Sequence, residues 1–183
     1  MDTTIKSINL SLTNRCNLRC SYCTIWKERP KYNLRKSVFS QILSTEVIDA
    51  RASMTFTGGE PFLNDSIFDY TRQLLNKNPY FLKTISTNGT LLAKIMKFLG
   101  LFSKDLPPDF SLHISVDNIN NIVNERGTRT KDILKNIGLI KRKYPAVMVK
   151  LKYTVTPSNY AGILNTYNYA KDMRLGFKVK LVE

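Results

Sequence analysis

The sequence predicts an α/β fold in which six parallel strands alternate with helices to form a partial (β/α)6 barrel of the TIM-barrel type. Three observations predict it. Short apolar runs alternate with longer amphipathic runs from end to end, the pattern of successive βαβ units. Polar motifs follow the predicted strands, and 183 residues that are 43% hydrophobic can bury one substantial core. No low-complexity linker divides the chain, so we expect a single domain over residues 1–183.

The first half of the chain predicts three strands and two helices. Ile8, Leu10 and Leu12 alternate with polar residues, which predicts the first strand. A helix is expected over residues 38–49, because four apolar side chains fall on one stripe. The elements expected next are a strand over 54–57, a helix that begins after Asp65-Ser66 and ends at Leu75, and a strand over 82–86. The stripe consists of Val38, Ile42, Leu43 and Val47.

The second half continues the same alternation. A helix over 91–98 is separated by a loop with Pro107-Pro108 from a strand over 110–116. Right-handed crossovers make such strands parallel, so their carboxyl ends meet at one edge of the sheet, where ligands gather. The remaining elements are helices over 131–143 and 160–173 and strands over 147–155 and 177–182.

Polar motifs follow four successive predicted strands. A segment that holds all three cysteines follows the first strand. Gly58-Gly59-Glu60-Pro61 follows the second, Thr87-Asn88-Gly89 follows the third, and Ser115 and Asp117 end the fourth. Each motif alone is also explained as a tight turn or a solvated strand end. Four such placements in a row predict a functional site at this edge.

The cysteines predict an iron–sulfur cluster. Cys16, Cys20 and Cys23 are the only cysteines, and three thiolates can hold three corners of a cubane 4Fe-4S cluster. One iron is then open to another ligand. Zinc is the alternative, but it needs a fourth ligand, and the only histidine, His113, is remote in sequence. A buried structural role is expected for His113.

The charge pattern suggests a partner at the cysteine segment. The formal net charge is +14, and most of it is spread over predicted helix faces. The residues around the cysteines are more densely basic, and we expect this rim to dock an acidic electron donor such as flavodoxin or ferredoxin. Only the net charge favours a nucleic-acid partner, so such a partner is not expected. The rim consists of Arg15, Arg19, Lys27, Arg29, Lys31, Arg35 and Lys36.

Nothing in the sequence predicts a membrane segment. No apolar run approaches the ~20 residues needed to cross a bilayer, and the N-terminus lacks a signal-peptide pattern. We expect a cytoplasmic protein, because a reducing compartment keeps clustered thiols free for metal binding.

These motifs resemble those of the radical S-adenosylmethionine (radical SAM) enzymes. The cysteine spacing is the family's, with an aromatic residue, Tyr22, before the last cysteine, and Gly58-Gly59-Glu60-Pro61 matches the second hallmark. Weaker matches continue in order, so the likeness spans nearly the whole chain. They are Ser86-Thr87-Asn88-Gly89, Ser115-Val116-Asp117, Arg126-Gly127, Thr154-Val155 and Asn159.

The resemblance implies a 4Fe-4S cluster on the three cysteines, with S-adenosylmethionine (SAM) chelating the open iron. It implies an enzyme that cleaves SAM reductively to a deoxyadenosyl radical, which abstracts hydrogen from a peptide, nucleotide or small metabolite. The residues implied to bind SAM are Tyr22 beside adenine, Gly58, Gly59 and Glu60 at the methionine end, Thr87, Asn88, Ser115 and Asp117 as polar partners, and Arg126 or Lys152 at the carboxylate.

Two departures from the family pattern keep alternatives open. No thiol is left for an auxiliary cluster, and the chain stops directly after the sixth predicted strand. Phe177, Val179 and Leu181 would give that strand an apolar edge for a substrate or partner chain to cover. These two departures are compatible with a minimal enzyme, with a truncated fragment and with one part of a complex. The rival function is a truncated or degenerate cluster-binding or electron-transfer module with no substrate site.

Overall fold

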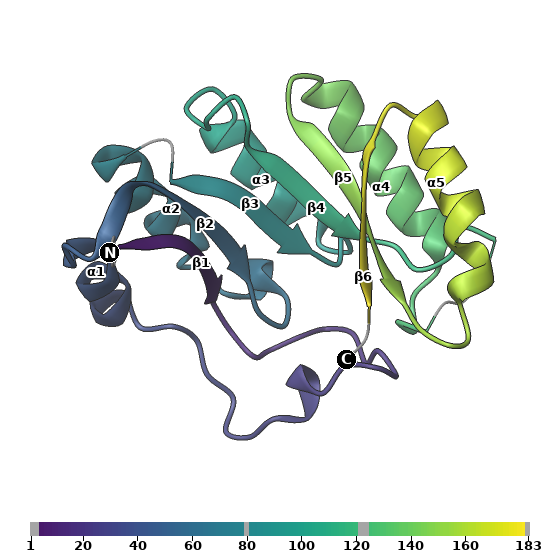
Figure 1. Cartoon of the computed structure of the whole chain (residues 1–183), viewed down its shortest axis with the longest axis horizontal. Coiled ribbons are helices and arrows are strands. Elements are labelled where there is room, and N and C mark those ends of the chain that lie inside the picture. The colour runs from purple at the N-terminus through teal and green to yellow at the C-terminus, as the bar shows by residue number, and fades with distance from the viewer. Residues whose placement is uncertain (1–3, 79–80, 121–124, 182–183) are drawn as a thin grey trace.

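Six parallel strands form one curved sheet. The computed structural model describes residues 4–78, 81–120 and 125–181. The strands lie side by side in chain order from β1 to β6, and every neighbouring pair is parallel (Figure 1). The predicted α/β fold with a partial parallel barrel is confirmed. The strands are β1 Ile5–Ser11, β2 Ile48–Thr57, β3 Leu82–Thr87, β4 Ser111–Ser115, β5 Met148–Val155 and β6 Gly176–Leu181.

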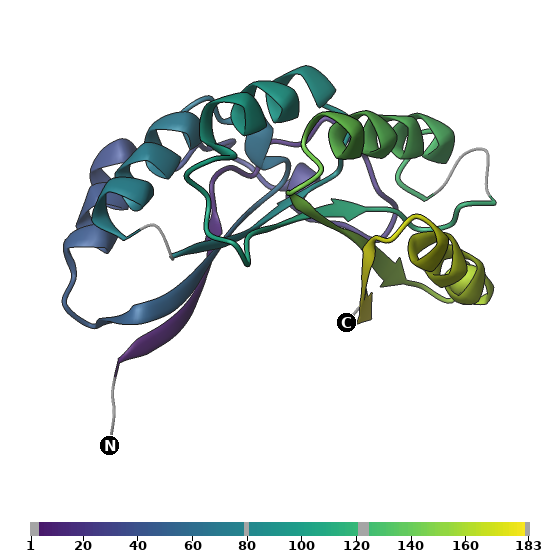
Figure 2. The same cartoon turned by 90° about the horizontal axis from the view of Figure 1, so that it is seen from above.

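The helices that connect these strands lie on the convex side of the sheet (Figure 2). The concave side is therefore left for polar side chains and ligands. No helix in the described ranges is both long and apolar enough to cross a membrane. The helices are α1 Lys36–Ser44, α2 Ile67–Lys77, α3 Leu92–Phe102, α4 Thr130–Lys143 and α5 Ile163–Asp172, with short 3-10 turns at Ile25–Lys27, Pro61–Leu63 and Tyr160–Gly162.

The hydrophobic core fills the space between the sheet and the helices. Alternation along each strand sends apolar side chains to this side and polar ones to the concave side. In β5, Leu151 and Tyr153 are fully buried, whereas Lys150 and Lys152, which alternate with them along the strand, are only partly buried. The two faces of the half-barrel thus have opposite chemistry.

The first predicted helix was too long. Helix α1 ends at Ser44, and Val47 is 50% exposed instead of lying on the buried stripe. The buried residues of α1 are Phe39 and Leu43. The carbonyl of Val47 accepts a hydrogen bond from the backbone N–H of Ile5 at 2.7 Å. Pairing with β1 therefore takes the chain into β2 well before residue 54, and β-branched residues suit that extended backbone.

Other boundaries differ less. The helix expected over 91–98 continues to Phe102, and the one expected over 160–173 is a 3-10 turn followed by α5. The strand expected over 177–182 corresponds to β6, although residue 182 lies outside the described residues. Every predicted element is present in its predicted order.

The core predicts a large difference between two identical substitutions. Leu151→Ala removes a fully buried side chain from β5 and is expected to lower the free energy of unfolding by about 2–5 kcal/mol. Leu164→Ala on α5, where the side chain is 66% exposed, is the matched control and is expected to change it by less than about 0.5 kcal/mol. Urea unfolding measures both, and equal midpoints would contradict the described core.

Candidate active site

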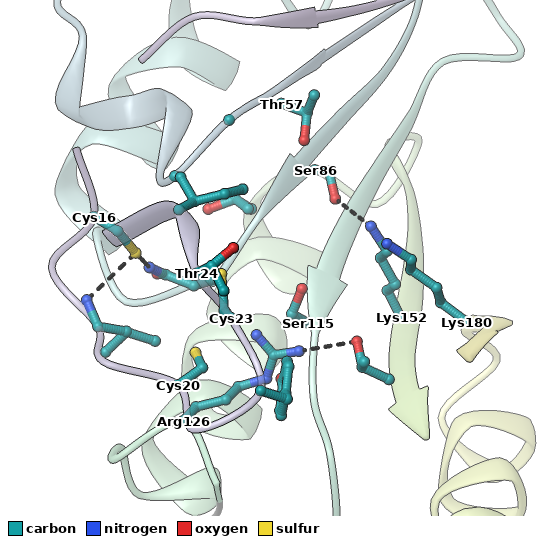
Figure 3. Close-up of a pocket in the computed structure, with 18 of the residues that line it drawn as sticks. Cys16, Cys20, Cys23, Thr24, Thr57, Ser86, Ser115, Arg126, Lys152 and Lys180 are labelled. Atoms are coloured by element: carbon teal, nitrogen blue, oxygen red, sulfur yellow. Dashed lines mark hydrogen bonds between the residues drawn. The ribbon is translucent and has the colours of Figure 1, made fainter. Parts of the chain in front are cut away.

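The three cysteines open onto one pocket of about 350 Å³ at the carboxyl edge of the sheet (Figure 3). Other residues of the cysteine segment, residues at the ends of β2 to β6, and Arg126 form the rest of its wall. Of the thirteen predicted site residues, eleven line it, and Glu60 and Asp117 do not. The lining residues are Cys16, Leu18, Cys20, Tyr22, Cys23, Thr24, Ile25, Thr57, Gly58, Gly59, Ser86, Thr87, Asn88, Ser115, Arg126, Lys152, Thr154, Lys180 and Leu181.

The segment that carries the cysteines, residues 12–35, is a loop closed at its base. Thr13 and Asn33 form an antiparallel bridge, and the N–H of Leu34 donates to the carbonyl of Leu12 at 2.8 Å. The Asn14 side chain crosses the loop, donating to the carbonyl of Pro30 and accepting from the N–H of Tyr32. These bonds join the two ends of a segment whose only helical part is the 3-10 turn at Ile25–Lys27.

The thiols are drawn inward by local contacts. The indole N–H of Trp26 donates to the carbonyl of Cys20 at 3.1 Å, and the N–H of Leu18 donates to the sulfur of Cys16 at 3.4 Å. Burial raises the pKa of the Cys16 thiol, and burial also raises that of Cys20. The charge of Arg126 acts on Cys20 in the opposite direction and lowers the pKa of that thiol.

Two glycines bring the second strand end against the cysteine loop. The N–H of Gly59 donates to the carbonyl of Thr13 at 2.7 Å, and the N–H of Glu60 donates to that of Arg15 at 2.8 Å. A Cβ at Gly59 would lie 2.2 Å from the Arg15 carbonyl oxygen, and Gly58 has a φ of +131°. The close approach of the protein's own backbone therefore requires glycine at these two positions, and both glycines also line the pocket.

Glu60 is buried behind the pocket wall. It is fully buried, and its carboxylate accepts from the Thr87 hydroxyl at 2.7 Å and from the N–H groups of Asn88 and Phe62 at 2.7 and 3.3 Å. Burial raises the pKa of Glu60 to about 7, although these donors favour the ionised form. These contacts fit a role for Glu60 in orienting the turn after β2, because both carboxylate oxygens already have protein partners.

A buried triad joins the cysteine loop to the end of β4. The Tyr22 hydroxyl donates to the Asp117 carboxylate at 3.0 Å, and Nε of Arg126 donates to the same carboxylate at 2.8 Å. The Arg126 guanidinium also lies 5.4 Å from the Tyr22 ring centroid and donates to the Thr154 hydroxyl at 3.4 Å. Asp117 is 1% exposed, so it holds Tyr22 and Arg126 in place from below the pocket surface.

Several lining residues were missed by the sequence reasoning. Lys180 of β6 was not predicted, although it alternates with apolar neighbours just as Lys152 does in β5, and that alternation could have placed it on the concave face. Thr24 and Ile25, which follow the last cysteine, carried no comparable signal. Ser86 and Thr154 were noticed only as parts of motifs.

His113 does not lie with the cysteines. Its Nε2 is 3.0 Å from the hydroxyl of Ser111, its side chain is buried, and it is absent from the wall of the cysteine pocket. In the described ranges, no three His, Cys, Asp or Glu side chains are arranged to hold a single metal ion. Zinc would therefore lack the fourth protein ligand that the sequence offered.

The fold and the site define a class of protein: an α/β half-barrel that presents a three-thiol loop at the carboxyl edge of its parallel sheet. Residues 10–170 match the family model described as Radical SAM superfamily, and the chain belongs to that superfamily. Its cofactors are those of the superfamily, a 4Fe-4S cluster and SAM. The resemblance drawn from the motifs is confirmed.

Curated relatives and solved structures agree with this assignment. The chain is 30% identical over 173 residues to a GTP 3',8-cyclase of Limosilactobacillus fermentum, covering 90% of this chain and 50% of the relative. The structure of anSMEcpe with bound AdoMet and a peptide matches with a TM-score of 0.71 at 21% identity, covering 98% of this chain and 51% of that one. SuiB of Streptococcus suis bound to SAM matches with a TM-score of 0.78 at 15% identity, covering 99% and 41%. The chain thus spans about half the length of the curated relatives it matches.

The residues present fit these cofactors. Three thiols with no further cysteine suit a cubane that keeps one iron open, and they share the pocket wall with hydroxyl groups and three cations, Arg126, Lys152 and Lys180. A cosubstrate with a carboxylate, a ribose and an adenine needs such a mixture of donors and apolar surface. Leu18, Tyr22 and Ile25 supply the apolar part.

The close backbone approach at Gly59 predicts a loss of cluster loading. In Gly59→Ala the added Cβ must displace the Arg15 carbonyl next to Cys16, so we expect iron and sulfide content after anaerobic reconstitution to fall severalfold. Gly138→Ala on α4, where an added Cβ meets nothing within 4 Å, is the control and should load normally. Full loading of the Gly59 variant would contradict the displacement.

The contacts of Glu60 predict a structural defect in Glu60→Gln. An amide NH2 replaces one of the two acceptor oxygens and faces a backbone donor, the Asn88 N–H or the Phe62 N–H, so we expect about 1–3 kcal/mol less free energy of unfolding. Glu46→Gln on the exposed surface is the control and is expected to be neutral. Urea unfolding measures both, and a neutral Glu60→Gln would show that the buried acceptor is dispensable.

Proposed function

We propose that this chain is the catalytic core of a radical SAM enzyme that cleaves SAM reductively and abstracts hydrogen from its substrate. The observation that carries the proposal is the convergence of three thiols, the glycine turn and the ends of the following strands on one pocket. Membership of the superfamily supports it, and so does the curated likeness to GTP 3',8-cyclases. The activity of those longer relatives is attributed to this chain only as part of the proposal.

In this proposal Cys16, Cys20 and Cys23 hold the cluster, and SAM lies against the rest of the pocket wall. When bound together, and with one external electron delivered to the cluster, the two cofactors would supply cleavage of a sulfonium C–S bond to methionine and a deoxyadenosyl radical. The protein's task is to orient SAM and to limit access of water to it. Gly58, Gly59, Thr87, Asn88 and Ser115 stay as proposed contacts, with Tyr22 near the adenine.

Arg126 is proposed to pair with the cosubstrate carboxylate, in preference to Lys152. The Arg126 guanidinium lies beside Cys20, and its charge lowers the pKa of that thiol against the effect of burial (Figure 3). The Lys152 ammonium instead points toward Ser86 and donates to its hydroxyl at 3.3 Å (Figure 3). Asp117 and Glu60 are then positioning residues, because neither lines the pocket.

Two partners follow from the surface. The basic rim around the cysteine loop is exposed at Arg15, Arg19, Lys27 and Arg29, which suits an acidic electron donor such as flavodoxin or ferredoxin. Val179 and Leu181 of edge strand β6 are 45% and 67% exposed, and we propose that a substrate or a partner chain covers them. A cytoplasmic location completes the proposal, because it keeps the thiols reduced.

The experiment that tests the function is a product assay. The chain is reconstituted with iron and sulfide without oxygen, reduced with dithionite and mixed with SAM, and deoxyadenosine is measured by chromatography. Its appearance supports the enzyme. A reducible cluster that yields no deoxyadenosine supports the rival hypothesis, an electron-transfer or degenerate cluster-binding module.

Single cysteine variants make the ligand assignment testable. Cys16→Ala, Cys20→Ala and Cys23→Ala are each expected to lose the cluster and all deoxyadenosine formation, because the chain has no spare thiol. Ser21→Ala, an exposed change within the same loop, should keep both. Iron, sulfide and visible absorbance are the readouts, and a cysteine variant with full loading would overturn the assignment.

A further inference from the structure

A second cavity of about 270 Å³ lies on the concave face beside the cysteine pocket. The two cavities share four lining residues, Thr57, Ser86, Lys152 and Lys180, so one leads into the other. The second cavity goes deeper along β1 to β6 and reaches neither the cysteines nor the glycine turn. A molecule seated in it would project toward the proposed SAM site.

The wall of this second cavity is cationic. It includes three lysines, Lys152, Lys178 and Lys180, and no carboxylate. Lys178 pairs in register with Lys152, and Lys180 pairs with Thr154, so the three ammonium groups come from adjacent strands and share one face. Among the described residues, no salt bridge neutralises any of them. Figure 3 shows Lys152 and Lys180 side by side.

The positive charges of these lysines repel one another, and a bound anion would offset that repulsion. Burial, followed by the charges of Lys180 and Lys178, lowers the pKa of Lys152 to about 8. Burial, followed by Lys150, Lys178 and Lys152, lowers the pKa of His113 to about 4, so the imidazole is neutral near pH 7 and adds no charge. The cavity therefore stays net positive at neutral pH through its lysines alone.

Hydrogen-bond donors complete the lining. Thr55, Thr57, Thr84 and Ser86 line the same cavity with hydroxyl groups from β2 and β3, opposite the lysines of β5 and β6. A phosphate ester carries three strong acceptor oxygens and nearly two negative charges, and it matches several lysines surrounded by hydroxyls. A single carboxylate would leave much of this donor set unused.

We propose that the second cavity binds a phosphate group of the substrate. The inference rests on the proposed function, because it makes the cavity the substrate side of the same active site. Lys178 and Lys180 hold the phosphate together with Lys152, and the remainder of the substrate extends through the shared wall toward the cysteine pocket. The substrate class is therefore a phosphorylated small molecule.

The test is calorimetric binding of phenyl phosphate to the full chain at pH about 7.5, where it is a dianion. The Lys178→Met/Lys180→Met variant is expected to bind at least about tenfold more weakly than wild type, because it loses two charge-assisted contacts. Both side chains are exposed on an edge strand, so the fold is expected to persist. If it does not, Lys152→Met is measured with the same expectation.

The matched control is Lys131→Met/Lys135→Met, which removes the same charge from exposed positions on α4. It should bind phenyl phosphate as wild type does. If both double variants bind phenyl phosphate equally weakly, the effect is explained by net charge and the proposal is overturned. The proposal is also overturned if wild type does not bind phenyl phosphate. Phenylmalonate, a dicarboxylate of similar charge, is expected to bind more weakly, and equal or tighter binding would overturn the assignment to phosphate.

Failure here and failure of the proposed function are distinguishable. Phenyl phosphate binding requires neither a reduced cluster nor SAM, whereas deoxyadenosine formation requires both. A lysine-dependent site in a protein that forms no deoxyadenosine would leave the phosphate site in place and remove the radical reaction. Deoxyadenosine formation without phenyl phosphate binding would support the radical reaction and overturn the phosphate site.

Discussion

The structure of the site depends on the contact between the cysteine loop and the turn after β2. Backbone hydrogen bonds from Gly59 and Glu60 to the carbonyls of Thr13 and Arg15 bring two strand ends within van der Waals distance. No side chain fits between them, so this is a contact that only glycine allows. This contact fixes the position of Arg15 and therefore of Cys16, the next residue, from which the rest of the cysteine loop continues.

Two buried carboxylates connect the cysteine loop and the turn after β2 to the ends of the following strands. Glu60 links the turn after β2 to Thr87 and Asn88 after β3, and Asp117 after β4 links Tyr22 in the loop to Arg126. Buried carboxylates are costly unless they are hydrogen-bonded, and the described contacts of both meet that condition. The pocket wall is thus positioned by acidic residues that do not themselves face the pocket.

The concave face divides into two regions of different chemistry. Near the carboxyl edge, thiols, glycines and small hydroxyls surround a pocket suited to a cluster with its cosubstrate. Deeper along the strands, lysines of β5 and β6 face threonines of β2 and β3. Because the helices bury the apolar side of every strand, this polar interior is available for binding, and its charge is set by the last two strands.

The sequence by itself determined the order of elements, the parallel sheet, the cofactor class and the edge where the motifs meet. The elements and the sheet follow from local periodicity. The cofactor class follows from the resemblance of the cysteine motif and of Gly58-Gly59-Glu60-Pro61 to those of one family, because the cysteine spacing alone also allows zinc. Only the tertiary structure decided that Glu60 and Asp117 lie behind the pocket, that α1 ends before Val47, and that Lys180 joins Lys152 on one wall. Each of these depends on which strands become neighbours and on what packs against a buried side chain, and neither property is encoded within a short stretch of chain.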